Sequence, residues 1–238
     1  MIFWFPYTYK VCVSTYTKTC VQRLYKTPGK QLSVIHNGID TSLRDLAQRN
    51  SSRIERFRQT HHIHTARVGL YYGHSGASKG LDYFVHAIPH IIKKYPDFKA
   101  IINLIPGKRD YLIYKLVKKL GIQEHVLFLH GVQKQELVNL VLLADMVIVP
   151  SISDGFGLVA AEVSQLEKPL IVTRNGALPE VVSGKVVFLR DLRIESFVEA
   201  IDKVAHKKWH IIAPKSFSRD ETVKKYEALY QRASLNTP

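Results

Sequence analysis

The chain has 238 residues, of which 46% are hydrophobic, and its 34 lysine and arginine residues against 20 acidic ones give a formal charge of +14. This length suffices for one large domain, or for one domain with part of another, and the hydrophobic fraction is typical of a globular protein. Cys12 and Cys20 are too few for a disulfide framework and no run of about 18 apolar residues could span a bilayer, so we expect a soluble cytoplasmic protein.

Two short strands open the chain. They are expected at 10–14 and 31–36, on either side of a helix at 16–25, and the Asn-Gly pair within 36–40 then predicts a turn. The mostly polar stretch 41–66 shows little hydrophobic periodicity and is interpreted as a linker. Its histidines, His61, His62 and His64, have no carboxylate or thiol at ligand spacing, so we expect no metal site there.

A second series of alternating strands and helices begins at residue 67. Strands are expected at 68–72, 100–104, 126–129, 146–149, 169–173 and 185–189, and helices at 79–94, 111–120, 134–143, 157–166, 178–182, 194–204 and 219–231. This alternation predicts an α/β fold in which a Rossmann-like parallel sheet is covered by helices on both faces. The sheet has no G-x-G-x-x-G fingerprint, which disfavours a nicotinamide or flavin enzyme.

The stretch 150–162 reads PSISDGFGLVAAE and follows a short apolar run that is typical of a buried strand. Open α/β sheets bind ligands at such junctions between a strand and the following helix. Gly155 and Gly157 let the backbone approach a ligand, and the helix that follows directs free amides toward it. A sugar, a ribose or a phosphate would fit there.

Two carboxylates accompany this turn. Asp154 precedes the glycines, and Glu162 lies at the edge of the buried helix face, where a half-buried carboxylate needs a partner. The structural alternative is that the glycines only shape a tight turn, that Asp154 caps the helix, and that Glu162 is solvated or pairs with a lysine.

A second glycine-containing turn, 72–80, follows the first strand of the series. Its Lys79 stands at the start of the next helix, where the ammonium and the free helical amides together favour an anion such as a diphosphate. The alternative is an exposed first-turn lysine and a surface His74. Both turns leave carboxyl ends of strands, so we expect them to open on the same edge and to face one ligand, a sugar nucleotide.

The positive charge is also compatible with nucleic acid or anionic lipid. Nucleic acid is disfavoured because the sequence contains no RNP-like aromatic strand, no zinc-finger spacing and no helix with an arginine-dominated face. The lysine-rich sites, at 93–94, 118–119 and 206–209, lie near helix ends, where a solvated face is the usual explanation and a peripheral membrane surface is the alternative.

These motifs resemble those of the retaining, two-lobed (GT-B) glycosyltransferases of the glycogen-synthase and sucrose-synthase type, known as group 1 or family 4. Family patterns vIpNGiD, GR-x-x-x-x-KG, PS-x-x-EGFGL-x-x-x-E, GkPvIat and GglpEvv are similar to residues 34–40, 73–80, 150–162, 168–173 and 176–182. The resemblance covers nearly all of the chain. This sequence departs from the patterns at Asp154, which replaces Glu, at His74, which replaces Arg, and at Glu167, where the family prefers Gly.

The resemblance implies roles for the residues of both turns. Lys79 would contact the donor diphosphate, Glu162 would hold the ribose hydroxyls, and Asp154 would hold the transferred sugar together with neighbouring backbone amides. Lys79, Asp154 and His74 are therefore assigned to catalysis, although histidine is only partly protonated at neutral pH. The residues assigned to donor binding are Gly73, Gly76, Gly155, Phe156, Gly157, Leu158 and Glu162. Glu180 is expected to cap a helix or to pair locally.

Family members also carry an N-terminal lobe that binds the acceptor, whereas this chain begins within what resembles the last strand and helix of that lobe. Residues 1–66 are interpreted as a remnant of the acceptor lobe and a linker, and 67–238 as the sugar-nucleotide-binding domain with its C-terminal helix. The function implied is transfer of a sugar from a nucleoside-diphosphate sugar to a glycan, lipid-linked or other hydroxyl acceptor, with retention and without a metal or other cofactor. The acceptor lobe could be a separate polypeptide. The alternative is a non-catalytic sugar-nucleotide-binding or partner subunit.

Overall fold

The computed structural model describes residues 9–40, 42–43, 51–63 and 67–235. Within them, a seven-stranded sheet has the order β5-β4-β3-β6-β7-β8-β9. Its strands are β3 (Arg67–Gly73), β4 (Phe98–Leu104), β5 (Val126–His130), β6 (Met146–Val149), β7 (Leu170–Val172), β8 (Gly184–Phe188) and β9 (His210–Ile212). Strands β3 to β8 run parallel, and β9 pairs antiparallel with β8 at one edge.

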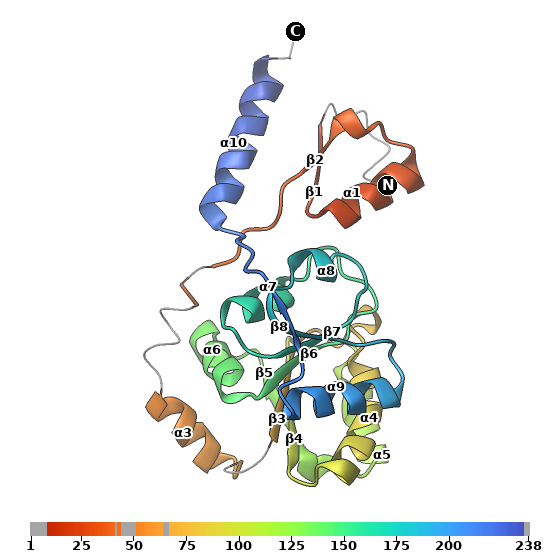
Figure 1. Ribbon diagram of the computed structural model, residues 1–238, viewed down its shortest axis with the longest axis vertical. Coiled ribbons are helices and arrows are strands. Elements are labelled where there is room, and N and C mark those ends of the chain that lie inside the picture. The colour runs from red at the N-terminus through yellow and green to blue at the C-terminus, as the bar shows by residue number, and fades with distance from the viewer. Residues whose placement is uncertain (1–8, 41, 44–50, 64–66, 236–238) are drawn as a thin grey trace.

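Helices cover both faces of this sheet (Figure 1). One hydrophobic core joins the sheet to α4 (Leu81–Lys94), α5 (Asp110–Lys119) and α9 (Ile194–Ala205). The core on the opposite face joins it to α3 (Ser51–Thr60), α6 (Lys134–Leu143), α7 (Leu158–Gln165) and the short α8 (Leu178–Val181). Short 3₁₀ turns complete this unit at η3 (Ala77–Lys79) and η4 (Gln123–His125). The α/β fold expected from the sequence is therefore confirmed.

Side chains of the central strands alternate between the two cores, as a two-residue strand period requires. In β3, Leu70 and Tyr72 belong to the core beneath α6 and α7, whereas Tyr71 belongs to the core beneath α4 and α9. The strand is buried on both faces, which explains its nearly continuous apolar sequence.

The interpretation of 41–66 as a linker was wrong for its second half, because 51–60 forms α3. Ile54 and Phe57 lie three residues apart and pack against the core beside α6, while Arg58 donates hydrogen bonds to the carbonyls of Ile63 and Leu143. The four residues that adjoin these two apolar residues in the sequence are all charged, so no helical pattern of apolar residues could be recognised. Residues 41, 44–50 and 64–66 of the expected linker lie outside the described residues.

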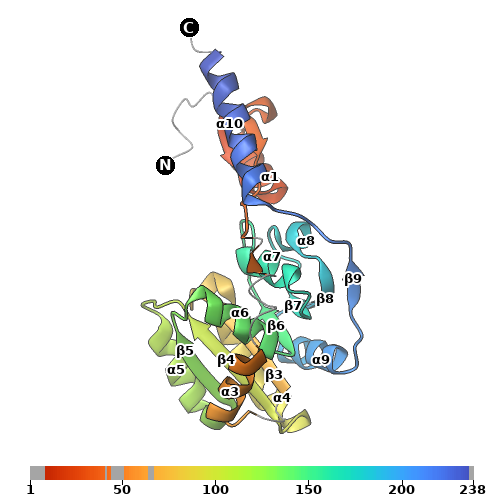
Figure 2. The ribbon, with the colours of Figure 1, turned by 90° about the vertical axis from the view of Figure 1, so that its left-hand side faces the viewer.

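A smaller unit lies at the other end of the molecule. Strands β1 (Lys10–Cys12) and β2 (Leu32–Val34) pair in parallel and are connected through α1 (Thr15–Tyr25) and the turn η2 (Gly29–Gln31). The C-terminal helix α10 (Arg219–Leu235) stands beside them rather than beside the large sheet (Figures 1 and 2). The side chain of Thr222 in α10 donates a hydrogen bond to the carbonyl of His36. Cys12 and Cys20 are both free thiols.

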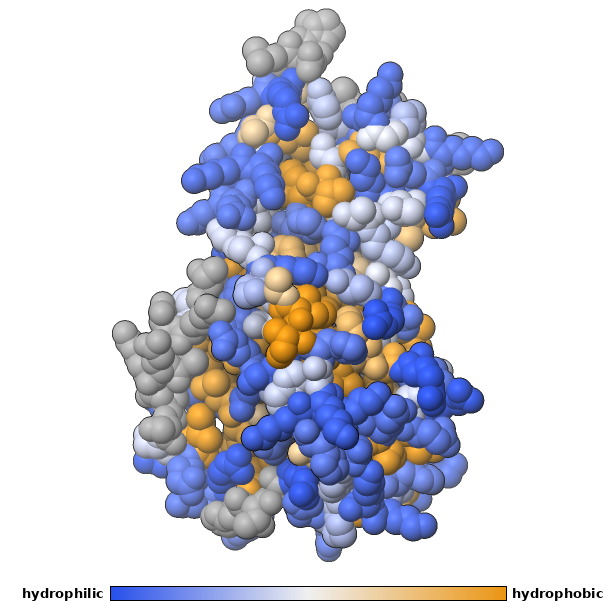
Figure 3. All heavy atoms as spheres, in the orientation of Figure 1, coloured by the Kyte–Doolittle hydropathy of each residue, from blue (hydrophilic) through white to orange (hydrophobic). Residues whose placement is uncertain are grey.

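Glu167, where the resembling family prefers glycine, adopts a positive φ of 56° just after α7. A side chain at such a φ is strained, and glycine is not. The residue therefore occupies a position whose backbone explains the family preference. The surface in Figure 3 is largely hydrophilic, with smaller apolar patches between charged side chains. None of the described helices has the length and apolar character needed to cross a membrane.

Candidate functional site

A pocket of about 540 Å³ opens at the carboxyl ends of β3, β4, β5 and β6. The two glycine-containing turns after β3 and β6 both contribute to its wall, so the structure brings them to the same edge of the sheet. The lining residues that the sequence had singled out are Gly73, His74, Lys79, Asp154, Gly155, Phe156, Gly157, Leu158 and Glu162. Gly76, also singled out, is the N-cap of η3 and is not among the lining residues.

Lys79 and Asp154 form an ion pair within this pocket. The ammonium of Lys79 donates to Oδ2 of Asp154 at 2.7 Å, and the side chains are 35% and 13% exposed. The other carboxylate oxygen of Asp154 accepts from the amide of Phe156 at 3.3 Å. Asp154 is therefore not the helix cap considered from the sequence, since the N-cap of α7 is Gly157, which makes no side-chain capping bond.

The two turns are joined by their backbones. The amides of Ile152 and Ser153 both donate to the carbonyl of Ser78, at 2.8 and 3.3 Å. Gly80 has a φ of 68°, and a Cβ on it would lie only 2.0 Å from the carbonyl oxygen of Pro150. Only glycine permits this approach, which holds Lys79 and Asp154 within reach of each other.

Gly157 has a similar requirement at the start of α7. Its φ is 91°, and a Cβ there would meet a side-chain carbon of Leu178 at 2.7 Å. Gly155 has no such constraint, because a Cβ on it would make an ordinary contact of 3.5 Å with Thr17. The sequence treated the two glycines alike, whereas the backbone requires glycine only at 157.

Glu162 finds its partner in Tyr72, the residue before the last of β3. The tyrosine hydroxyl donates to Oε2 of Glu162 at 3.0 Å, and Tyr72 is 8% exposed. Burial raises the pKa of the Glu162 carboxyl above its ordinary value, and the hydrogen bond from Tyr72 partly opposes this rise. The sequence indicated that Glu162 needs a hydrogen-bond partner but did not identify Tyr72 as that partner. The pattern that could have identified it is a tyrosine at the carboxyl end of a buried strand.

Three other predicted site residues differ in how they face the pocket. His74 is exposed, and its carbonyl accepts a hydrogen bond from the Tyr71 hydroxyl at 2.6 Å. Leu158 is 48% exposed and forms an apolar part of the wall. The Phe156 ring is 3% exposed and lies edge-on to Phe217, with ring centroids 5.3 Å apart, so that it serves packing more than ligand contact.

The N-terminal unit also touches the turn after β6. The Ser14 hydroxyl, at the N-cap of α1, donates to the carbonyl of Gly155 at 2.7 Å. The helix that carries Ser14 is thereby placed directly against the turn that carries Asp154. The smaller unit and the pocket therefore share a wall.

Glu180 fixes the same helix: it caps a helix as expected, but that helix is the distant α1, so the pairing is not local. Its carboxylate accepts hydrogen bonds from the amides of Thr15 and Tyr16, at 2.9 and 3.2 Å, and lies 2.7 Å from Nε2 of His36. Burial raises the pKa of Glu180, but these hydrogen bonds outweigh burial and leave the pKa below its ordinary value. The partners are more than 140 residues away in sequence, beyond any local pattern.

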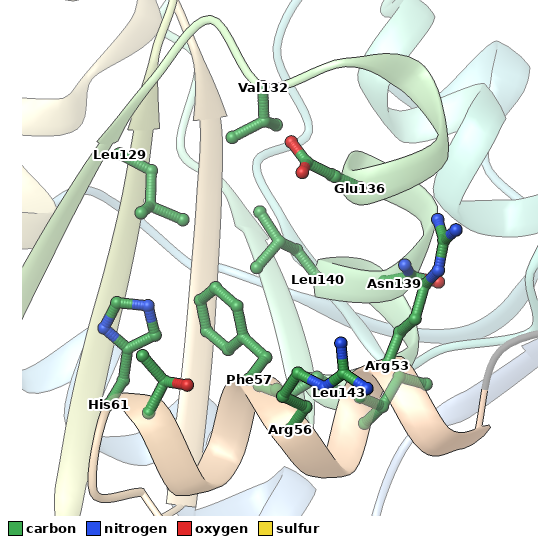
Figure 4. A pocket seen from close by; sticks show the side chains of 12 residues that line it. Arg53, Arg56, Phe57, His61, Leu129, Val132, Glu136, Asn139, Leu140 and Leu143 are labelled. Carbon is green, nitrogen blue, oxygen red and sulfur yellow. The ribbon is translucent and has the colours of Figure 1, made fainter.

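A second hollow, of about 660 Å³, lies between α3, α6 and the edge strand β5 (Figure 4). Its floor is apolar, and Arg53 and Arg56 are at its rim. The His61 ring packs at a tilt of 43° against the Phe57 ring, with centroids 4.3 Å apart, and His64 lies outside the described residues. No group of three or more histidine, cysteine or acidic side chains in the described part of the chain is placed to hold a metal ion.

Comparison with known proteins gives a consistent result. The family model "Glycosyl transferases group 1" matches residues 52–224. An uncharacterized glycosyltransferase of Methanocaldococcus jannaschii is 29% identical over 203 residues, covering 83% of this chain and 52% of that protein. A D-inositol 3-phosphate glycosyltransferase of Mycolicibacterium smegmatis is 28% identical over 225 residues, covering 88% and 49%. The chain thus spans about half the length of these relatives.

Solved structures show the same fold. A glycosyltransferase from Rickettsia africae superposes with a TM-score of 0.82 at 18% identity, over 97% of this chain and 64% of that one. Anabaena Alr3699/HepE in complex with UDP superposes with a TM-score of 0.78 at 20% identity, over 94% and 64%. At these identities the likeness supports the fold alone.

Proposed function

Because the chain belongs to the group 1 glycosyl transferases, whose family model matches most of its length, we propose that it transfers a sugar from a nucleoside-diphosphate sugar to an acceptor hydroxyl. The observation that carries this proposal is the convergence of Lys79, Asp154 and the Tyr72–Glu162 pair on one pocket at the carboxyl edge of the sheet. A sugar nucleotide contains an anionic diphosphate between two hydroxyl-bearing rings. The pocket offers a cation together with two carboxylates.

Lys79 is proposed to hold the diphosphate. Its side chain is about one-third exposed and its ammonium is already oriented by Asp154, so a bound diphosphate would take over part of that interaction. His74, exposed at the same turn, takes the place of the arginine of the resembling family and is proposed to donate a ring N–H to the phosphate. We propose that these side chains neutralise the diphosphate without a metal ion.

The carboxylates are proposed to hold hydroxyl groups. Tyr72 occupies Oε2 of Glu162, which leaves the remaining acceptor positions of that carboxylate for the ribose hydroxyls. Asp154 faces the pocket from the turn after β6 and would accept from the hydroxyls of the transferred sugar once Lys79 turns to the diphosphate. Hydrogen bonds to an ionised acceptor contribute roughly 1.5–3 kcal/mol each.

The proposed step has a simple balance. The bond between the anomeric carbon and the diphosphate oxygen breaks, and both of its electrons leave with the nucleoside diphosphate. The acceptor oxygen bonds to the anomeric carbon on the same face, and the acceptor proton passes to the departing diphosphate. Lys79 stabilises the charge that develops on the leaving group, which is an electrostatic contribution to catalysis.

The acceptor and its binding surface belong to the proposal as well. We propose a glycan, lipid-linked or other hydroxyl acceptor, which would approach from the side of β1, β2 and α1, where Ser14 contacts the turn after β6. A separate acceptor-lobe polypeptide and a peripheral membrane surface are the partners that we propose to test.

A donor-turnover assay tests this function. The purified chain is incubated with UDP-, GDP- and ADP-linked hexoses, alone and with candidate acceptors, and release of the nucleoside diphosphate is followed. We expect the chain to release the nucleoside diphosphate slowly without an acceptor and faster with one. We expect no release in Asp154→Ala. Tight binding of a sugar nucleotide without release under any condition would instead support the alternative of a non-catalytic binding subunit.

A further inference from the structure

Asn103 presents an unsatisfied polar group in the same pocket. It lies on β4 and is 4% exposed, and its side-chain oxygen has no hydrogen-bond partner among the described residues. The residue also lines the pocket at the carboxyl edge of the sheet. Oxygen and nitrogen of an amide can exchange places by a flip, so the group is best regarded as a donor and an acceptor side by side.

A buried amide without a partner is costly to folding, because its hydrogen bonds with water are lost and not replaced. Such groups are uncommon in native proteins, and each one calls for an explanation. A leucine or valine would continue the apolar pattern of β4, in which Ile101 and Ile102 are fully buried. A ligand that enters the pocket and completes the hydrogen bonds would explain why an asparagine is present.

The position of Asn103 in the sheet indicates which part of a ligand it would meet. It pairs in register with Tyr72 of β3 and with Leu129 of β5. Because register partners in a parallel sheet face the same side, Asn103 stands beside the Tyr72–Glu162 pair. It lies on the side away from β6, whose turn carries Asp154.

Beyond Asn103 the pocket becomes apolar. Ile105 after β4 is 45% exposed, and it lines the pocket together with Val132 after β5 and Leu137 in α6. The Lys79–Asp154 pair therefore lies on the β3–β6 side of the pocket, and aliphatic side chains with the Asn103 amide, next to the Tyr72–Glu162 pair, form a second end on the β4–β5 side. A flat heteroaromatic ring with polar edges fits the second end.

We propose that the Asn103 side chain hydrogen-bonds the edge of the donor nucleobase and thereby selects among nucleoside diphosphates. Nucleobases differ in which neighbouring edge atoms donate and which accept, and an amide side chain held in one orientation pairs through two bonds only with the edge that matches it. Ile105, Val132 and Leu137 pack against the faces of the base. This inference rests on the proposed function and adds the residue that distinguishes one base from another.

The test compares base preference before and after removal of the amide. UDP, GDP, ADP, CDP and dTDP are titrated calorimetrically into the full chain and into Asn103→Leu, and ribose 5-phosphate serves as a ligand without a base. We expect the preferred nucleotide to lose roughly tenfold in affinity, the five affinities to converge, and ribose 5-phosphate binding to stay unchanged.

Asn139→Leu is the matched control. Asn139 also has a buried, unpartnered amide oxygen, but it lies on α6 at the second hollow (Figure 4). This variant should keep the base preference of the parent. Thermal unfolding establishes that each variant is folded, and Asn103→Ala replaces Asn103→Leu if leucine prevents folding.

Two results would overturn the inference alone. An unchanged order and spread of the five affinities in the Asn103 variant would show that its amide does not contact the base. An equal loss for all ligands, ribose 5-phosphate included, would place the amide at the ribose or phosphate. If the parent binds none of the five nucleotides, the proposed function fails first and this inference fails with it.

Discussion

Replacing Tyr72 by phenylalanine removes a single hydroxyl from the pocket. It tests whether the hydrogen bond from Tyr72 keeps the Glu162 carboxylate ionised and able to bind a ligand. The hydroxyl donates to Oε2 of Glu162 at 3.0 Å, and Tyr72 is buried. A hydrogen bond to a charged group contributes roughly 1.5–3 kcal/mol. We therefore expect Tyr72→Phe to lower the free energy of unfolding by about this amount at pH 8, where the carboxylate is ionised.

The same substitution should change how binding depends on pH. Burial raises the pKa of Glu162, and the bond from Tyr72 opposes that rise, so the pKa should rise further in Tyr72→Phe. Ribose hydroxyls donate to the ionised carboxylate, and affinity is therefore lost as pH falls through the pKa of Glu162. In the variant this loss should begin at a higher pH than in the parent.

Calorimetric titration with a nucleoside-diphosphate sugar between pH 5 and pH 8 measures this shift, because such a ligand has no terminal phosphate that titrates in the range. Tyr95→Phe is the matched control, since the Tyr95 hydroxyl also donates to a carboxylate, that of Asp202, at 2.7 Å. Coincident pH profiles for Tyr72→Phe and the parent would refute the assignment of Glu162 to the ribose.

The remaining predictions concern two other carboxylates, those of Asp154 and Glu180. Asp154→Asn should bind nucleoside diphosphates several-fold more tightly, because Lys79 loses its competing partner, while donor turnover falls at least a hundredfold; weaker binding measured by calorimetry would contradict the first half. Glu180→Gln should lower stability to urea by about 1–2 kcal/mol at pH 7, because the amides of Thr15 and Tyr16 lose a charged acceptor. Since the pKa of Glu180 is lowered in the fold, its contribution is present above the ordinary carboxyl range and is lost as pH falls through the lowered value. The difference between the variant and the parent should therefore shrink as pH falls below the ordinary carboxyl range, and a constant difference between pH 7 and pH 3 would contradict the role of the charge.

Much of the sheet could be predicted from the sequence because its strands are buried on both faces. The runs that became β3, β4 and β6 are apolar and β-branched, and glycine turns mark their carboxyl ends. Strand β9 lacked this signal. Two of its three residues are exposed, and it lies at the edge of the sheet, where it pairs antiparallel with β8 alone. Helix α3 was missed for a related reason, because Ile54 and Phe57 are its main apolar anchors.

The candidate site divides in the same way. Turn glycines and charged residues next to strand ends can be recognised locally, which is why Lys79, Asp154 and Glu162 were named. The partners of these residues cannot be recognised locally, because Tyr72 lies 90 residues from Glu162 and Lys79 lies 75 residues from Asp154. Asn103 was overlooked although a polar residue inside the apolar run IINL was a visible departure from the pattern.

The central claim is that the pocket binds a nucleoside-diphosphate sugar through Lys79, and one measurement tests it most directly. UDP-, GDP- and ADP-linked hexoses are titrated calorimetrically into the parent, into Lys79→Ala, and into Lys203→Ala, a control in which the lysine is also ion-paired at 2.7 Å but lies on α9. We predict that at least one sugar nucleotide binds the parent and the Lys203 variant equally and binds Lys79→Ala at least tenfold more weakly. Equal affinity for parent and Lys79→Ala, or no binding to the parent at millimolar ligand, would contradict the claim.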